Sequence, residues 1–482
     1  MTPDIQIAKT DGNLGVVSNT ERILAIVGPA SAGTSNVAAS YVNKDDVITA
    51  FTSGKLVEAL SYCIAQGVPC VGIKSAATTA AAYGTIDHSG VLGTATVAAG
   101  STAPDSDFDA VVKITTGGAL GTAGIVFSYS LDDGVNYSVP QALGTSLTMT
   151  LARGVSFTLS SSTSTLLAGD VFRVSTKGPK STTGDLAAAL TALSDYSGEW
   201  LRVLVLADAD DTILAQLDTF VKTFHTQGKY PEAITCTRAR DVAGAEDRAT
   251  FQAAMATIAA GVQSDEVSCC VDACELVSVV NGWRLRQPPS IPYAARLMLI
   301  DDSQDAAAKS DGALPGVFVE TAAGLRNFHD ERRYPGLDVL GFTTLRTWGG
   351  RPISPGVYVN NPRLLSGAGS DYRYFQLSAI INRIIESAYS LLQPRLSQTV
   401  LVDPSSGKIR ESVAKGIEDS ISAELRTLYQ DPARVSGIQF SLSRTDDVLG
   451  TDTLHFSINA VPLAYVKHFI GKTGLVRVLP TA

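Results

Sequence analysis

The chain has 482 residues, of which 45% are hydrophobic and 18% are charged, and its 38 basic and 47 acidic side chains give a net charge of −9. This length is enough for several domains with cores of their own. No apolar run approaches the ~20 residues of a membrane-spanning helix, and the basic residues are scattered, which argues against an integral membrane protein and against direct nucleic-acid binding.

The N-terminal segment begins MTPDIQIAKTDGN and lacks the pattern of a secretory signal, so we expect synthesis and assembly in the cytoplasm. Ile5 and Ile7 alternate with polar residues in the manner of a short strand. The Gly- and Asn-containing stretch that follows cannot build a core for this strand. Residues 1–20 are therefore predicted to be an extended arm, either a frayed terminus or a strand that pairs with a neighbouring subunit.

An α/β pattern begins after this arm. A buried strand is predicted at Ile23–Val27, a helix at Leu56–Gln66 and a second strand at Val68–Ile73. The loop Gly28–Ser35 resembles a phosphate-binding loop, but Thr34 stands where that loop needs a lysine. A plain turn is therefore the favoured interpretation over a nucleotide site.

Short alternating strands interrupt the α/β pattern between about residues 91 and 174. They are separated by turn sequences such as Asp132-Asp133-Gly134, and their spacing is typical of a β-sandwich. We predict an inserted, surface-exposed β-sandwich domain at residues 84–179. Its strands are expected at 111–114, 124–129, 147–151, 155–159 and 171–174.

The α/β pattern resumes after the insertion, so the sequence predicts one α/β domain split into residues 21–83 and 180–350. The expected helices are Asp185–Leu193, Thr212–His225 and Glu246–Ala260, and the expected strands are Leu201–Leu206, Ala233–Thr237, Val267–Val271 and Val339–Trp348.

Two polar clusters lie in the irregular region near residues 281–356. His329-Asp330-Glu331 has no nucleophile near it in any recognisable motif, so a solvated loop or an intersubunit ion-pair cluster is favoured over a catalytic site. The segment around Asp301 and Asp302 lacks the glycine and distal glutamate of a calcium loop and is predicted to be a polar surface loop. The six cysteines lie in apolar segments and are predicted to be buried free thiols, and the sequence contains no zinc motif.

The last third of the chain predicts an α+β domain. Helical periodicity runs over 372–393 and again over 409–428, and strict alternation at Ile438–Leu442 and Leu454–Ile458 predicts an antiparallel strand pair. The run Leu475–Leu479 has no evident partner nearby, so residues 466–482 are predicted to be a second extended arm.

The order of these elements resembles the C-terminal domain of contractile-tail sheath proteins. The resemblance is carried by GVYV from Gly356, YRYFQLSAIINRIIESAYSLLQ, TVLVDP, KIRESVAKGIEDSISAELRTLY and the hairpin GIQFSLSR with DTLHFSINAVPLAYV. It implies a polymerisation domain at residues 351–465. The sequence departs from the family at Arg373, which stands alone where many members carry an arginine pair.

The resemblance implies a subunit that polymerises helically with copies of itself around an inner tail tube and contracts to drive the tube through a target envelope. It also implies contacts with baseplate and tail terminator proteins, a place in a virion tail or injection-system particle, and no enzymatic activity or cofactor. The residues expected in strands exchanged between subunits are Ile5, Ile7, Ile438, Phe440, Leu442, Leu454, Phe456, Ile458, Leu475, Val476, Val478 and Leu479. Those expected on a tube-facing helix are Glu411, Lys415, Glu418, Asp419 and Arg426, for which an ordinary solvated face is an equal alternative.

Two other functions stay open at this point. The strand and loop at Ile23–Ser35 allow an α/β nucleotide-binding enzyme, and the β-sandwich allows an adhesion or carbohydrate-binding surface protein.

Overall fold

The computed structural model describes residues 22–90, 92–160, 163–242, 244–320, 327–349, 355–367 and 369–467. These residues form two compact units. The first takes in the chain up to Asp302 together with Ala306–Asn382, and the second takes in Ser303–Asp305 together with the chain from Arg383 onward. The predicted arms therefore lie outside the described residues, apart from residues 466 and 467, and the predicted domain boundaries stay predictions.

A six-stranded sheet in the order β17-β16-β15-β1-β3-β2 forms the centre of the first unit. Its strands are parallel except for β2, which pairs antiparallel with β3 at one edge. β1 pairs with β15 from Leu24↔Arg202 to Val27↔Val205, across the long insertion between them. The strands are β1 (Leu24–Gly28), β2 (Ala38–Tyr41), β3 (Cys70–Lys74), β15 (Arg202–Asp208), β16 (Glu232–Cys236) and β17 (Val267–Cys270).

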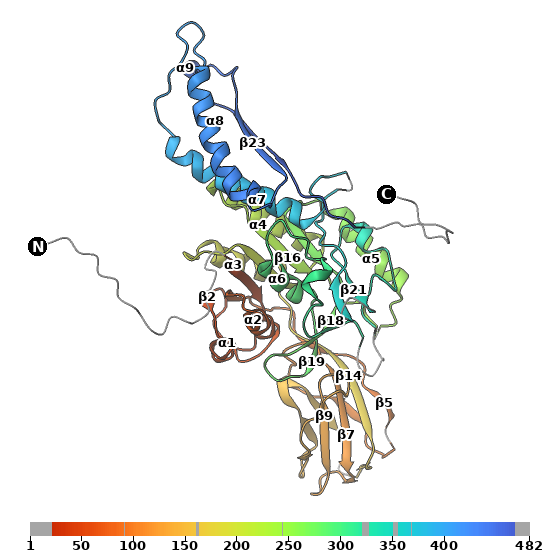
Figure 1. Cartoon of the computed structure of the whole chain (residues 1–482). Coiled ribbons are helices and arrows are strands. Elements are labelled where there is room, and N and C mark those ends of the chain that lie inside the picture. Colours follow the sequence, from red (N-terminus) through yellow and green to blue (C-terminus); the bar gives the residue numbers. More distant parts are fainter. Residues whose placement is uncertain are drawn as a thin grey trace, which may run out of the picture. The chain divides into compact units, whose positions relative to one another are not determined.

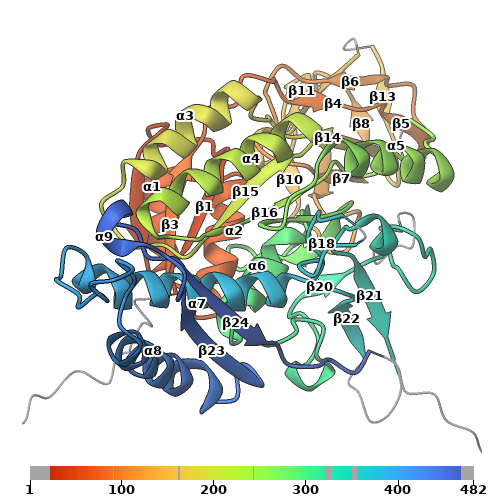
Figure 2. The same cartoon turned by 90° about the horizontal axis from the view of Figure 1, so that it is seen from above.

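Helices cover both faces of this sheet, as expected for parallel strands that are apolar on both sides. One face packs against α3, α4 and α5, and Figure 2 shows α3 and α4 lying side by side. The other face packs against α2 and α6. The helices of this unit are α1 (Lys44–Phe51), α2 (Lys55–Ala65), α3 (Thr183–Ser194), α4 (Asp211–Thr223), α5 (Arg248–Gly261) and α6 (Ser290–Leu299), with α7 (Phe375–Leu392) beginning here and ending in the second unit.

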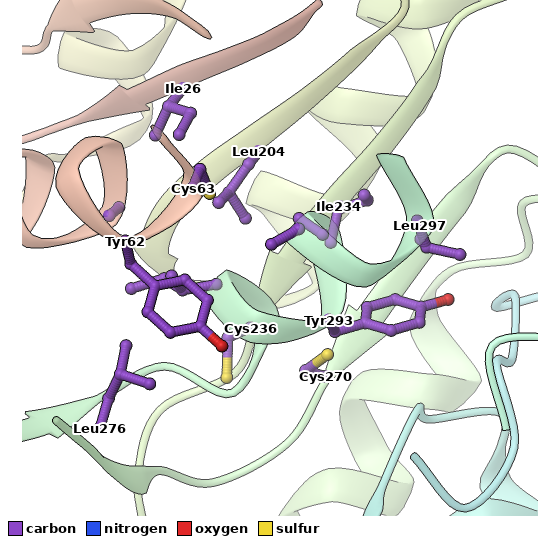
Figure 3. Packing of buried hydrophobic residues seen from close by; sticks show 14 of the residues in the cluster. Ile26, Tyr62, Cys63, Leu204, Ile234, Cys236, Cys270, Leu276, Tyr293 and Leu297 are labelled. Carbon is purple, nitrogen blue, oxygen red and sulfur yellow. The ribbon is translucent and has the colours of Figure 1, made fainter. Parts of the chain in front are cut away.

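The core between the sheet and α2 and α6 is apolar and closely packed (Figure 3). Ile26, Leu204 and Ile234 come from three neighbouring strands, and Tyr62 from α2 and Tyr293 from α6 close over them. All five side chains are 3% exposed or less. Burial on this scale explains why short apolar runs alone predicted these strands.

Two features of the first unit were not predicted. The pair α1 and β2 was missed because Ala38–Tyr41 is short and half-buried, so it carries little alternation. Helix α6 was missed because three prolines lie at Pro288, Pro289 and Pro292. Pro292 occupies the first turn of α6, where a backbone N–H has no helical partner to lose.

Small antiparallel sheets fill the region that the sequence predicted to be irregular. The strand expected at Val339–Trp348 is confirmed only for its second half, because a single tight turn occupies Asp338–Leu340. One sheet has the order β19-β18-β20, and another pairs β21 with β22. The strands are β18 (Cys274–Val277), β19 (Arg284–Gln287), β20 (Val317–Phe318), β21 (Leu345–Trp348) and β22 (Gly356–Val359).

The insertion consists of antiparallel sheets around a core of its own. One sheet has the order β10-β9-β7-β14-β4, with β5 also paired to β14, and a second has the order β11-β12-β6. They enclose a core that includes Phe108, Phe157 and Phe172, and Figure 1 shows β5, β7, β9 and β14 running alongside one another. The strands are β4 (Ala82–Tyr83), β5 (Asp87–Gly90), β6 (Val97–Ala99), β7 (Asp109–Thr116), β8 (Gly118–Ala119), β9 (Val126–Ser130), β10 (Gln141–Ala142), β11 (Thr148–Thr150), β12 (Ser156–Leu159), β13 (Thr165–Leu166) and β14 (Val171–Lys177).

Largely buried ion pairs join the insertion to α2. Arg153 of the insertion binds Glu58 at 2.9 Å and Asp105 at 2.7 Å. Lys55 at the start of α2 binds Asp107 at 3.1 Å. Burial opposes ionisation of Asp107, but Lys55 and a nearby arginine outweigh it and lower the pKa of this carboxyl to about 2. The insertion is thus attached to the α/β part of the first unit by ion pairs as well as by the two chain segments that connect them.

A second buried network corrects the prediction for Asp302. Arg202 is 1% exposed, and its guanidinium binds Glu232 at 3.0 Å and Asp302 at 2.6 Å. It also donates to the carbonyl of Leu297 at 2.8 Å and lies over the ring of Phe375. Asp302 is therefore a buried partner of a core arginine, and the prediction of a polar surface loop was wrong at this residue.

The His329-Asp330-Glu331 cluster is also buried, so the prediction of a solvated loop or an intersubunit cluster was wrong. His329 and Asp330 are 6% and 1% exposed. His329 Nε2 lies 2.7 Å from a Glu331 oxygen, and the Asp330 carboxylate accepts hydrogen bonds from the backbone and the hydroxyl of Thr347. The cluster holds its own loop against β21, and its partners lie too far away in sequence for a local pattern to reveal them.

A buried carboxyl at the start of β17 makes stability depend on pH. Burial, with a further contribution from Asp265, raises the pKa of Glu266 to about 8. A Glu266 oxygen lies 2.9 Å from His225 Nε2, and burial lowers the pKa of His225, so at neutral pH the pair is a hydrogen bond between neutral groups. The pKa of Glu266 is thus higher in the folded protein than its value of about 4.3 in the unfolded chain. Protonated Glu266 therefore contributes fully to stability below about pH 4.3, and this contribution is lost as the pH rises to about 8.

Replacing Glu266 by Gln is therefore expected to flatten the fall in melting temperature between about pH 5 and pH 8, because glutamine cannot ionise. Melting temperatures of the wild type and the variant, measured by thermal unfolding across this pH range, check the prediction. The matched control is Glu199→Gln, which replaces an exposed carboxyl. Equal slopes for wild type and Glu266→Gln would contradict the assignment.

All six cysteines are buried and unpaired, as predicted. Across the described ranges, no three His, Cys, Asp or Glu side chains are grouped so that they could hold a metal ion. Within the same ranges, none of the helices combines the length and apolar character needed to cross a bilayer.

Candidate assembly interface

The second unit is built around a helix and a two-stranded sheet. β23 pairs antiparallel with β24, from Gly437↔Val461 to Leu442↔Phe456, and Figure 1 shows β23 alongside α8. Alternate residues of β23 are buried, and the buried side chains of α8 pack in the same unit. The elements are α8 (Glu411–Leu425), a single wider helical turn at Arg426–Gln430, β23 (Gly437–Leu442), α9 (Val448–Thr451) and β24 (Phe456–Val461).

The predicted strand residues fall on these two strands, with one exception. Ile438, Phe440 and Leu442 are the buried residues of β23. Phe456 and Ile458 lie on β24, and Phe456 stacks on Phe440 with ring centroids 5.4 Å apart. Leu454 lies before the strand, because the Asp446 carboxylate accepts the backbone N–H of His455 at 2.6 Å and delays the start of the ladder. Ile5, Ile7, Leu475, Val476, Val478 and Leu479 lie outside the described residues.

β24 is the exposed strand of the pair. Its only strand partner among the described residues is β23, so the backbone groups along its other edge have no ladder partner there. Its side chains are exposed or half-buried, and Phe456 and Val461 are 49% and 59% exposed. An edge strand that exposes apolar side chains favours pairing with another strand.

Other large apolar side chains of the second unit are exposed as well. Scattered single residues of this kind are normal on a protein surface, but a concentration within one small unit indicates a contact surface. The exposed residues are Tyr389, Leu396, Leu401, Leu428, Leu449, Phe456, Val461 and Val466.

One arginine that the sequence analysis missed organises the charges of α8. Arg444, just after β23, binds Glu411 at 2.5 Å and Glu418 at 2.8 Å. These hydrogen bonds lower the pKa of both carboxyls. The only feature of the sequence that could have pointed to Arg444 is its position two residues after an alternating strand. Lys415, Asp419 and Arg426 lie exposed on the remaining polar surface of the helix.

The chain beyond β24 is held at a defined point. The Tyr465 hydroxyl donates to the carbonyl of Ser303 at 2.5 Å, and the Lys467 ammonium pairs with Asp305. Lys467 already belongs to the predicted C-terminal arm, residues 466–482. The segment that leads into it is therefore anchored within its own subunit.

The loop Gly28–Ser35 does not have the geometry of a phosphate cradle. The backbone N–H groups of Ser31 and Ala32 donate to the carbonyls of Ser53 and Phe51 at 2.8 and 3.1 Å. Donors that a phosphate would need are thus already used within the fold. This agrees with the prediction of a plain turn.

Residues 2–285 match the model of a protein family described as DUF2586, N-terminal domain. The chain belongs to the DUF2586 family. Among curated proteins, none matches this DUF2586 chain significantly.

Solved structures resemble the DUF2586 chain over almost its whole length. A chain of the anti-feeding prophage (AFP) baseplate is 12% identical and has a TM-score of 0.52, with 98% of this chain and 99% of that chain covered. A chain of the same baseplate in its contracted state gives 12% identity and a TM-score of 0.50, with 98% of each chain covered. The sheath tail protein from Desulfitobacterium hafniense is 11% identical, with a TM-score of 0.47 over 96% of this chain and 100% of that chain. The AFP baseplate chains confirm the predicted resemblance to contractile-tail proteins as a likeness of fold.

Proposed function

We propose that this DUF2586 protein is a structural subunit of a contractile tail sheath. In this proposal, copies stack helically around an inner tube and contract to drive the tube through a target envelope. The fold likeness to the AFP baseplate chain supports it. The observation that carries it is the open edge of β24, which lies in a unit rich in exposed apolar side chains.

Strand exchange would join the copies. The arm that contains Ile5 and Ile7, or the arm Leu475–Leu479, would add to the sheet beside β24 or β23 of a neighbouring subunit and satisfy backbone donors and acceptors of both chains. Contacts of this head-to-tail kind do not close on themselves, so they generate open helical polymers. The chain that links the arm to its own subunit would let subunits turn against one another during contraction while the added strand stays paired.

The polar surface of α8 is our proposal for the contact with the inner tube. Because Arg444 engages Glu411 and Glu418, we assign the direct contacts to Lys415, Asp419 and Arg426. The further partners would be baseplate and tail terminator proteins in a virion tail or injection-system particle. The role requires neither catalysis nor a cofactor.

Removing residues 474–482 is expected to abolish sheath polymers and leave a folded subunit, because the deletion removes the donated strand and spares every described element. Negative-stain electron microscopy and sedimentation of purified protein measure the result.

The matched control is removal of residues 480–482 alone, which keeps Leu475–Leu479 and should preserve polymerisation. Normal polymers from the longer deletion, with an unchanged circular dichroism spectrum, would overturn the strand-exchange proposal.

A further inference from the structure

A cavity of about 640 Å³ opens in the first unit at the carboxyl ends of the parallel strands. Asp208 ends β15, Thr237 follows β16 and Asp272 lies just beyond β17, and all three line the cavity. The sheet changes winding direction between β1 and β15, since the chain continues from β1 toward β3 and from β15 toward β16. Open α/β sheets bind ligands outside the carboxyl ends of their strands, and this cavity is lined at the ends of β15, β16 and β17. Its volume suits a molecule of about mononucleotide size.

The cationic side chains of this cavity differ in how they are neutralised. Lys55 pairs with Asp107, Lys180 with Asp208, and Arg238 with Glu246 at 2.6 Å. Arg240 lines the same cavity but makes no ion pair with any described carboxylate. Its guanidinium donates to backbone carbonyls instead, including that of Glu246 at 2.8 Å.

The environment of Arg240 favours an anion as its missing partner. The Arg240 Nε is buried and has no hydrogen-bond acceptor among the described residues. Arg248 lies close enough for the two like charges to lower the pKa of Arg248, after the larger effect of burial. The Asp272 carboxylate lies nearby and accepts the backbone N–H of Arg240 at 3.0 Å, but it makes no ion pair with the Arg240 guanidinium. Two neighbouring guanidinium groups, one of them with an unused donor, favour an oxyanion.

Two further residues of the cavity lining also have unused hydrogen-bonding capacity. Gln287 is 2% exposed, and neither atom of its amide has a partner among the described residues. Arg286 Nε beside it is likewise unpartnered. Leaving buried polar atoms without partners is unfavourable, so an occupant with oxygen and hydroxyl groups offers what the described residues do not supply.

We propose that this cavity binds a small phosphorylated molecule of about mononucleotide size, with Arg240 as the principal ligand of the phosphate. The polar atoms of Gln287 and Arg286 lie on the side where the organic part of the ligand would be recognised. The site is separate from the loop Gly28–Ser35 and from the strands of the assembly interface. Binding here involves no chemical step.

Isothermal titration of the full-length protein with AMP, ribose 5-phosphate and inorganic phosphate tests the proposal. We expect saturable one-to-one binding of at least one of the two organic phosphates, weakened at least tenfold in Arg240→Met. Lys180→Met, at a half-exposed position of the wall, should weaken it as well and serves if Arg240→Met unfolds. The matched control is Arg173→Met, which removes a partly exposed arginine paired with Asp133 outside the cavity.

Absence of saturable binding of both organic phosphates would overturn the proposal, and so would equal affinities of Arg240→Met and Arg173→Met. Inorganic phosphate that binds as tightly as ribose 5-phosphate would overturn the assignment of ligand size. Polymer formation is scored in the same samples. Because the cavity variants leave the arms and β24 intact, loss of ligand binding with normal polymers separates this proposal from the proposed sheath function.

Discussion

Replacing Arg202 by Met is expected to lower the free energy of unfolding by about 3–5 kcal/mol, because it removes the buried charge that Glu232 and Asp302 share. Glu232 is fully buried and Asp302 is 9% exposed. Asn382 also donates to Glu232 at 3.1 Å, and Arg22 lies 2.9 Å from Asp302, but neither replaces the buried guanidinium that binds both carboxylates. Urea unfolding followed by tryptophan fluorescence measures the loss.

The triple replacement Arg202→Met, Glu232→Gln and Asp302→Asn removes the charges together and should recover much of the lost stability. Lys229→Met is the surface control, since its pair with Glu199 is exposed and should contribute less than about 1 kcal/mol. A single Arg202→Met variant as stable as the Lys229→Met control would show that the network does not hold α6 and α7 against the sheet.

Replacing Arg153 by Met is expected to produce the second large effect, a loss of about 3 kcal/mol together with loosening of the insertion. Arg153 is the only described cation within ion-pair distance of Glu58, whose side chain is 3% exposed. Asp105 loses the same partner but keeps a hydrogen bond from Ser53. Limited proteolysis near residues 76–86 and 175–182 should therefore become faster, and urea unfolding should shift to lower concentration.

The matched control for Arg153→Met is again Arg173→Met, which removes an arginine within the insertion whose side chain is 38% exposed. If both variants are cut at the same rate as wild type, the ion pairs do not hold the insertion in place. If Arg173→Met is cut faster as well, the insertion is loosened by any loss of charge, and Arg153 has no special role.

The sequence predicted those parts of the fold whose signal is local. β1, β15, β16 and β17 are mostly apolar along their lengths, so their burial could be predicted without knowledge of their neighbours. The residues just before α3, α4 and α5 cap these helices, because their side chains accept hydrogen bonds from the first turn; they are Thr182, Asp210 and Asp247.

What the sequence could not predict depends on partners that are far apart in the chain. Asp302 lies in a segment with the composition of a surface loop, and it is buried against Arg202 and Arg22, which lie far earlier in the chain. His329 and Asp330 were misjudged for the same reason, since they bind Asp272 and Thr347. At the assembly interface, periodicity located α8, β23 and the first half of β24, but Arg444 carried no pattern of its own.

The pairing of β1 with β15 has a consequence for synthesis on the ribosome. The two central strands of the sheet are separated by more than 170 residues, so the nascent chain cannot complete its main core until Arg202–Asp208 has emerged. The insertion closes mainly on itself and is complete in the emerging chain before β15 appears. We therefore expect it to fold first, during translation, and to hold the two halves of the unfinished sheet near each other, which lowers the entropic cost of joining them.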